Sequence, residues 1–367
     1  MTRHNKVEVD RLTEKFFEQA RQHFRDGKSL EECGQALHPK LGVNAFRERI
    51  NEAFEKGYLV LKGKLAEEKL AVTIQSQWLR VYGQNVQVFV ADGSPDNAMF
   101  ALVAAEILLH LLRELLLNSR KTEVNIGVVS GSSTGETVKQ LVESRFWDEL
   151  IGNIDNVSKI INIAALNVTP VDGWELEGNA NIAVLRLAEM IRDRLPKCTV
   201  TPYGLSSTLV VSEAELDRED ISQSNKKVLE LADPDRLKAG AKSGLDLVIT
   251  GVGTPANSVF KRVLDAERIK SPKEMVGDVA FWPVDREGNP LALTRMATDG
   301  GEETCLIYSA IRLRTLQQLV KSGAKVVLIA RNKRRSDPVD KTEAILAAVN
   351  GGYVSHFVTD METALKL

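Results

Sequence analysis

The sequence predicts an α/β protein in which a mainly parallel, doubly wound, Rossmann-like sheet follows a smaller winged helix-turn-helix. From Val86 onward, apolar β-type runs alternate with segments of helical spacing, which is the pattern of βαβ units with helices on both faces of a sheet. The first 64 residues have instead the pattern of short helices. A length of 367 residues also exceeds what one hydrophobic core usually supports, so more than one domain is expected.

The N-terminal segment contains three predicted helices. Apolar residues recur at helical spacing across residues 9–24. Ser29 and Glu32 have the spacing of a capping box and begin a second, short helix. A third helix is expected over residues 43–57, and the brief alternation of residues 58–64 is typical of a β-wing.

In a winged helix-turn-helix the last of these helices enters the major groove of DNA, and the wing meets phosphates. The DNA-contacting residues predicted on this basis are Asn44, Arg47, Arg49, Asn51, Lys62 and Lys64. Residues 1–64 contain thirteen Lys/Arg and ten Asp/Glu, a charge of +3, against thirty-five and forty in the remainder. This asymmetry favours a module that faces nucleic acid. Glutamates on the same helix leave a helical oligomerisation module as the alternative.

The rest of the chain divides into a linker, residues 65–85, with a short amphipathic helix, and a sheet domain, residues 86–367. Strands are predicted at Val86–Ala91, Val124–Val129, Lys159–Leu166, Leu245–Gly251, Lys325–Ala330 and His356–Thr359. Helices are predicted at Ala98–Leu117, Asn179–Arg194, Glu302–Val320 and Lys341–Asn350. A hairpin is expected between Val276–Val284 and Pro290–Met296.

The segment from Val124 to Leu141 has the features of an anion site, because a strand-type run passes through a Gly/Ser/Thr loop into a helix. Its candidate ligand residues are Gly131, Ser132, Ser133, Thr134, Gly135 and Thr137. The segment lacks the P-loop and dinucleotide-binding patterns, so a small phosphorylated metabolite is expected rather than a nucleotide. An ordinary strand-to-helix turn is the alternative.

Three further segments bring suitable chemistry to the ends of strands, where doubly wound sheets bind ligands. One is the glycine-rich TGVGTP sequence, with Gly251, Gly253 and Thr254; another supplies the carboxylate of Asp278. A basic loop, RNKRRSDPVDK, ends at Lys341 in the first turn of a predicted helix. A lysine there opposes the helix dipole unless an anion is near. The alternative is an exposed Lys341 neutralised by Asp337 and Asp340.

Other classes of function find little support in the sequence. The five histidines and three cysteines have no metal-ligand spacing, so neither a metal site nor a cofactor is predicted. No catalytic residue is assigned. The N-terminus lacks the apolar core of a secretion signal, and the longest apolar stretch is interrupted by charges, so a cytoplasmic protein with no membrane span is expected.

The order of these motifs resembles the SorC-type, or sorbitol operon regulator, family of sugar-binding transcriptional regulators. The resemblance spans nearly the whole chain, through NEAFEKGYLVLKG, IGVVSGSSTGETV, DLVITGVGT, VGDVAFWPVDREGNPL and KTEAILAAVNGGYVSHFVTDMETA. It implies a winged-helix domain joined to an effector-sensing domain whose fold is that of sugar-phosphate isomerases and CoA transferases. It also implies that the predicted loops bind phosphate, with Thr134 and Thr137 as hydroxyl donors, Asp278 as the sugar-contacting acid and Lys341 at the ligand.

We therefore predict a homodimeric or homotetrameric regulator of carbohydrate metabolism with two kinds of ligand, operator DNA and a phosphorylated sugar. Two alternatives remain. One is a sugar-phosphate isomerase or lactonase that uses Asp278 and Glu136 for proton transfer, since SGSSTGET is similar to the isomerase-type loop. The other is a sugar-phosphate-binding oligomer that does not bind DNA.

Overall fold

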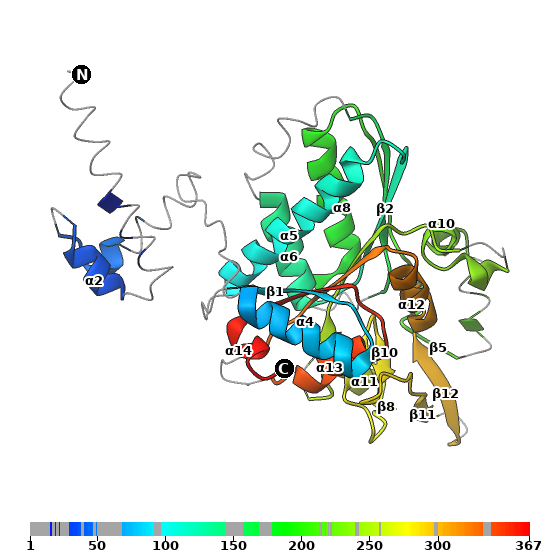
Figure 1. Ribbon diagram of the computed structural model, residues 1–367. Helices are drawn as coiled ribbons and strands as arrows, with labels where there is room; N and C mark the ends of the chain where they lie inside the picture. The colour runs from blue at the N-terminus through cyan, green and yellow to red at the C-terminus, as the bar shows by residue number, and fades with distance from the viewer. Residues whose placement is uncertain are drawn as a thin grey trace. The chain divides into compact units, whose positions relative to one another are not determined.

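The computed structural model of this chain divides into two compact units, Met1–Lys64 and Leu65–Leu367 (Figure 1). It describes residues 15–16, 19, 22, 29–37, 40–46, 49, 68–91, 97–143, 157–168, 178–212, 215–216, 218, 220, 222–238, 242–256, 258–296, 300–332 and 339–367.

In the smaller unit, the capping box predicted at Ser29 is confirmed. Helix α2 (Leu30–Gln35) begins there: the Glu32 N–H donates to Ser29 Oγ at 3.2 Å, and the Ser29 N–H donates to the Glu32 carboxylate at 2.8 Å. Residues 43–46 are also helical, and Phe46 is buried against Phe16 with ring centroids 5.5 Å apart. The predicted wing and most of the third helix lie outside the described residues.

The larger unit is built on one parallel sheet of seven strands, in the order β1-β14-β13-β6-β2-β3-β4. Their bounds are β1 Gln87–Ala91, β2 Glu123–Val128, β3 Ile160–Ala165, β4 Thr199–Tyr203, β6 Leu247–Thr250, β13 Lys325–Ile329 and β14 His356–Asp360. The central strand β6 is buried at every residue and β13 at all but its first, as expected for a sheet covered on both faces. The mainly parallel sheet and six of its strands are thus confirmed, and β4 is an addition.

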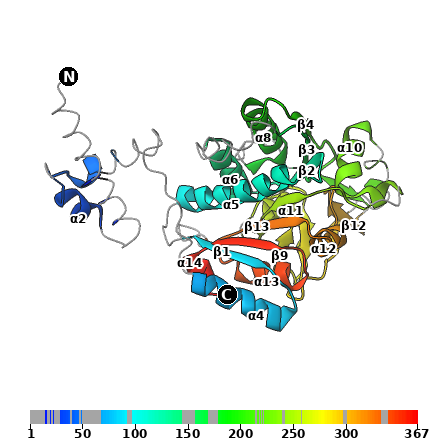
Figure 2. The same ribbon diagram turned by 45° about the horizontal axis from the view of Figure 1, so that its top comes forward.

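Helices cover this sheet on both faces. Figure 2 shows α5 (Asn97–Leu117), α6 (Ser132–Glu143) and α8 (Ala180–Arg194) on one side, with α4 (Glu68–Tyr82) and α13 (Thr342–Asn350) on the other. The other helices among the described residues of this unit are α10 Gln223–Ala232, η2 Pro234–Leu237, α11 Val259–Ala266, α12 Leu313–Lys321 and α14 Met361–Ala364. Among the helices that the structure describes, none has the length and apolarity needed to span a membrane.

Two small antiparallel sheets complete the unit, β10-β9-β7 and β5-β12-β11-β8. Their strands are β5 Val210–Ser212, β7 Val252–Gly253, β8 Ile269–Lys270, β9 Gly277–Val279, β10 Trp282–Val284, β11 Leu293–Met296 and β12 Glu302–Ile307. A second hydrophobic cluster, separate from the main core, joins them to α11 through residues such as Phe260, Phe281 and Leu293.

This region corrects two sequence predictions. The helix predicted at Glu302–Val320 is wrong, because its first part is strand β12, which pairs with β11 and β5, and only 313–321 is helical. The predicted hairpin is present only next to its turn, where Val284 bridges Pro290 and the Leu291 N–H donates to the Pro283 carbonyl at 2.9 Å. Beyond it, the segment 276–284 folds into the β9–β10 pair, and β11 pairs with β8 and β12. Pairing with other strands thus decides the structure of these short segments.

The helix predicted in the linker is present as α4, and it packs into the larger unit. Trp78 is fully buried, and its ring lies 5.4 Å from that of Phe357 in β14. Leu79, the next residue, is 53% exposed. The helix therefore contributes to the core on one side and is open on the other.

We expect Trp78→Ala to lower the free energy of unfolding of the larger unit by about 3–5 kcal/mol, because it removes a large buried side chain. Urea unfolding of the full chain, followed by circular dichroism, measures this. Leu79→Ala is the matched control and should change stability by no more than about 0.5 kcal/mol. Equal, small effects of both variants would contradict the packing of α4 described above.

Candidate functional site

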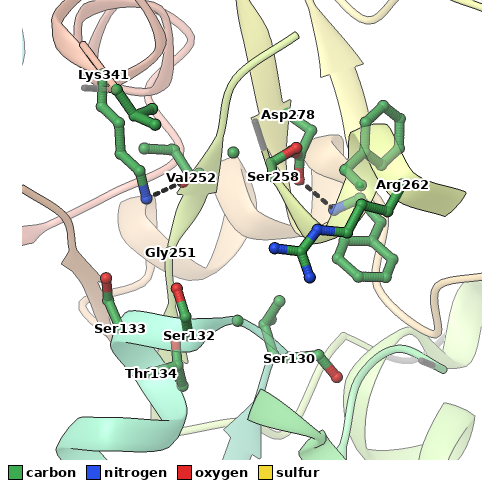
Figure 3. Close-up of a pocket in the computed structure, with 16 residues that line it drawn as sticks. Ser130, Ser132, Ser133, Thr134, Gly251, Val252, Ser258, Arg262, Asp278 and Lys341 are labelled. Carbon is green, nitrogen blue, oxygen red and sulfur yellow. Dashed lines mark hydrogen bonds between the residues drawn. The ribbon is translucent and has the colours of Figure 1, made fainter. Parts of the chain in front are cut away.

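A pocket of about 740 Å³, counted with its opening to solvent, lies where strands β2 and β6 end. The two strands are neighbours in the sheet, and the sheet continues in opposite directions from them: β3 lies on the far side of β2, and β13 lies on the far side of β6. Such a point is where doubly wound sheets bind ligands. The lining residues are Val129, Ser130, Gly131, Ser132, Ser133, Thr134, Gly251, Val252, Gly253, Ser258, Phe260, Arg262, Asp278, Phe281, Val339 and Lys341 (Figure 3).

Hydrogen bonds to residues 167, 178 and 180 hold the loop between β2 and α6 in place. The Ser130 N–H donates to Asn167 Oδ1 at 2.7 Å, and Ser130 Oγ accepts from the Ala180 N–H at 2.9 Å. The Gly131 N–H donates to the Gly178 carbonyl at 2.9 Å. These bonds fix the loop so that the first turn of α6 lines the pocket, and the first N–H groups of a helix favour an anion.

Thr134, in this first turn, presents a polar atom that lacks a partner. Its side chain is buried, and Oγ1 forms no hydrogen bond with any residue that the structure describes. A Cβ built on either Gly131 or Gly251 would lie 3.6 Å from this oxygen, so glycine on both loops leaves room beside it. Buried hydroxyls are normally satisfied, and a ligand in the pocket would satisfy this one.

Asp278 faces the pocket from β9 and is also incompletely satisfied. Its Oδ2 accepts from the Phe281 N–H at 3.3 Å, whereas the buried Oδ1 has no partner of ordinary hydrogen-bond geometry among the described residues. Oδ1 lies against Gly253, where an added Cβ would be 2.1 Å away. Burial raises the pKa of Asp278 to about 7, opposed by the Phe281 N–H, the charge of Lys341 and the Gly253 backbone.

The turn that follows Asp278 has an unfavourable backbone conformation. Ala280 and Phe281, between β9 and β10, have φ angles of 50° and 68°, in the left-handed region that glycine and asparagine prefer. This costs roughly 1–2 kcal/mol per residue. The same conformation directs the Phe281 N–H to Asp278 and places its ring 5.9 Å from that of Phe260, at the pocket wall.

Two cationic side chains line the pocket. Lys341 is buried at the start of α13, and its Nζ donates to the Val252 carbonyl at 2.8 Å. The exposed-lysine alternative is therefore wrong. Asp340 accepts instead from the Thr342 N–H and from Lys366 Nζ, and Asp337 lies outside the described residues. Arg262 extends over the pocket from α11 (Figure 3).

The pocket brings together most of the predicted ligand residues: Gly131, Ser132, Ser133, Thr134, Gly251, Gly253, Asp278 and Lys341. Gly135, Thr137 and Thr254 are not among its lining residues. The Thr137 hydroxyl donates within α6 to the Ser133 carbonyl at 2.8 Å, so it is engaged with its own helix.

Four lining residues were not predicted from the sequence: Ser258, Phe260, Arg262 and Phe281. One signal was available for two of them. Ser258 caps α11 by accepting from the Lys261 N–H, and Arg262 follows four residues later, a spacing that places both on one helix face.

The acid–base pair of the enzyme hypothesis is not assembled. Glu136 belongs to α6 but is not a lining residue of the pocket that contains Asp278. Within the described part of the chain, no group of three or more His, Cys, Asp or Glu side chains is arranged to hold a metal ion.

In the smaller unit, two of the predicted DNA-contacting residues are described. Asn44 and Arg49 are exposed, and the Arg49 guanidinium carbon lies 5.9 Å from the centroid of the Phe16 ring. Arg47, Asn51, Lys62 and Lys64 lie outside the described residues.

The sequence matches no known family and no curated protein. Among solved structures, it is similar to the full-length sorbitol operon regulator SorC from Klebsiella pneumoniae, with 16% identity, a TM-score of 0.54, and coverage of 96% of this chain and 97% of the other. A probable sor operon regulator from Shigella flexneri is 18% identical, with a TM-score of 0.51, over 80% of this chain and 98% of the other. The resemblance seen in the sequence is thus confirmed as a shared fold.

The raised pKa of Asp278 predicts a pH-dependent stability. The folded chain binds this proton more tightly than the unfolded chain, so the free energy of unfolding should fall as the pH rises from about 4 to about 7, by up to about 4 kcal/mol. Asp278→Asn carries no ionisable group and should raise the melting temperature at pH 8 relative to the natural chain, with a smaller gain near pH 4. Thermal unfolding at the two pH values measures this.

Glu136→Gln removes a carboxylate that does not line the pocket and serves as the control. If Asp278→Asn changed the melting temperature equally at pH 4 and pH 8, the result would contradict a raised pKa of Asp278.

Proposed function

We propose that this protein is a cytoplasmic transcriptional regulator of carbohydrate metabolism. In this proposal its smaller unit binds operator DNA, and its larger unit binds a phosphorylated sugar that changes the affinity for DNA. The chain acts as a homodimer or homotetramer, so that two copies of the smaller unit meet two half-sites.

The pocket between the ends of β2 and β6 carries this proposal. One set of lining groups suits a phosphate. It consists of the first turn of α6, with the unpartnered Thr134 hydroxyl, and the cations Lys341 and Arg262. Asp278, Ser258 and the aromatic wall suit the hydroxyls and C–H faces of a sugar. The shared fold with SorC, whose name describes a sorbitol operon regulator, supports the same function.

The enzyme hypothesis has less support. The lining residues include one carboxylate, Asp278, and no histidine, so the described pocket lacks the second carboxylate on which the enzyme hypothesis relies.

A selection of genomic DNA fragments on the full-length protein, at near-physiological salt, tests the DNA-binding part. We expect enrichment of a sequence with two related half-sites. Arg47→Ala should weaken binding to that sequence by about tenfold or more, because base contacts are worth about 1–3 kcal/mol each, while leaving sugar-phosphate binding intact. If no fragment is enriched, or if Arg47→Ala reduces both kinds of binding equally, the two-site proposal fails.

Thr134→Val tests the phosphate part. Valine keeps the shape of threonine but removes a hydroxyl that has no partner in the protein, so the unliganded variant should be as stable as the natural chain or more stable. Its affinity for the sugar phosphate should fall about tenfold. Isothermal titration calorimetry measures the affinity.

The matched control is Thr137→Val, which removes a buried hydroxyl of the same helix that does not line the pocket. It should lose stability, because its hydrogen bond to the Ser133 carbonyl is lost, and keep its affinity. Equal losses of affinity in both variants would remove Thr134 from the site.

A further inference from the structure

Asp278 is a buried carboxyl group whose negative charge is compensated only in part, by the Phe281 N–H, the charge of Lys341 and the Gly253 backbone. Among the described residues, no Lys or Arg nitrogen lies within 4.0 Å of it to form an ion pair, and its hydrogen bond from the Phe281 N–H is long. The positive charge of Lys341 lowers the pKa of Asp278 from a distance, but the Lys341 Nζ donates its hydrogen bond to the Val252 carbonyl. A carboxylate in such a position is costly, and the neutral acid is favoured.

Uncharged residues and two cationic side chains surround Asp278. Its pairing partners in β7 and β10 are Gly253 and Pro283, which carry no charge. From α11 the pocket receives Arg262, and from the start of α13 it receives Lys341. The described lining residues therefore provide two cations and a single acid, and this acid is the group facing the sugar side of the pocket.

We propose that Asp278 binds the ligand as a neutral acid, donating a hydrogen bond from Oδ1 to a hydroxyl or carbonyl oxygen of the sugar phosphate, so that ligand binding is coupled to retention of a proton. This inference rests on the proposed function and adds the protonation state and the kind of ligand atom at this position. The ligand atom is an oxygen and not an ammonium group, because the pocket already holds two cations.

The geometry matches this role. Oδ2 accepts the Phe281 N–H, which leaves Oδ1 as the carboxyl oxygen that carries the proton in this proposal. The positive φ angles of Ala280 and Phe281 keep that N–H in place, and the absence of a side chain on Gly253 leaves the space that Oδ1 occupies. A phosphate in the same pocket adds negative charge, which disfavours ionisation of Asp278 further.

The expected size of the effect follows from the pKa of about 7. If only the neutral acid binds, the affinity should fall about 30-fold between pH 6 and pH 8.5 from this group alone. The phosphate of the ligand titrates near pH 6 and must be separated from this effect. The variant Asp278→Asn separates the two effects. Its amide is a neutral donor at every pH, so the affinity of this variant changes with pH only through the titration of the ligand phosphate.

The experiment titrates full-length natural protein and Asp278→Asn with glucose 6-phosphate, fructose 6-phosphate and ribose 5-phosphate by calorimetry at pH 6, 7 and 8.5. For the probe that binds most tightly, the ratio of natural to variant affinity should fall about 30-fold across this range. Asp278→Asn should accordingly bind more tightly than the natural protein at pH 8.5. Glu136→Gln, the control, should follow the natural protein at each pH.

A second measurement needs only the natural protein. Calorimetry at pH 7.5 in two buffers of different ionisation enthalpy should reveal the uptake of about 0.8 proton per ligand bound. It keeps the inference testable even if Asp278→Asn fails to fold.

The outcomes are distinct. An affinity ratio that is constant with pH, or the absence of proton uptake, overturns the role of Asp278 while leaving the proposed function standing. A ratio that rises with pH means that the ionised acid binds and overturns it as well. If none of the probes binds at any pH, the proposed phosphosugar site itself fails, and this inference fails with it.

Discussion

The site depends on the parallel pairing of β2 with β6. In this register Val128 lies opposite Ile249, and the Val129 N–H donates to the Ile249 carbonyl at 2.9 Å, so both strands end at the same level of the sheet. The two glycine-containing loops, which are more than a hundred residues apart in the sequence, therefore begin side by side. Every other part of the pocket, including β9 and the start of α13, is added around these loops.

Two buried aspartates outside the pocket are paired with arginines: Asp233 accepts from Arg312 at 2.5 and 2.6 Å, and Asp220 accepts from Arg236 and from Tyr308. Inside the pocket, Thr134 and Asp278 each retain an unsatisfied oxygen.

The residues that hold the pocket loops continue this contrast. Asn167 and Asn332 use their Oδ1 atoms to hold the backbone of Ser130 and Lys341, and the Nδ2 atom of each is itself without a partner among the described residues. Unsatisfied buried groups cost stability, and a ligand that satisfied the Thr134 and Asp278 oxygens would recover part of that cost.

The main sheet and the glycine loops were predictable because their signals are local. A buried parallel strand is a short apolar run, and a helix N-terminus after Gly131 is visible in the residues themselves. The errors occur where tertiary contacts decide. Strands of two to four residues, such as β9 and β11, have too little pattern to be recognised, and the turn at Ala280 lacks the glycine or asparagine that marks such turns. Arg262 and Phe281 join the site only through packing of the small sheets.

The contacts of α13 connect the pocket with α4 inside the larger unit. Helix α13 touches β7, β9 and α4. At its start, Lys341 Nζ donates to the Val252 carbonyl, and a bound phosphate would compete for the same ammonium group. Lys341 begins α13, and α13 packs on α4, so contiguous contacts within the larger unit join the pocket to α4. Energetic coupling between distant sites is carried by packed elements of this kind.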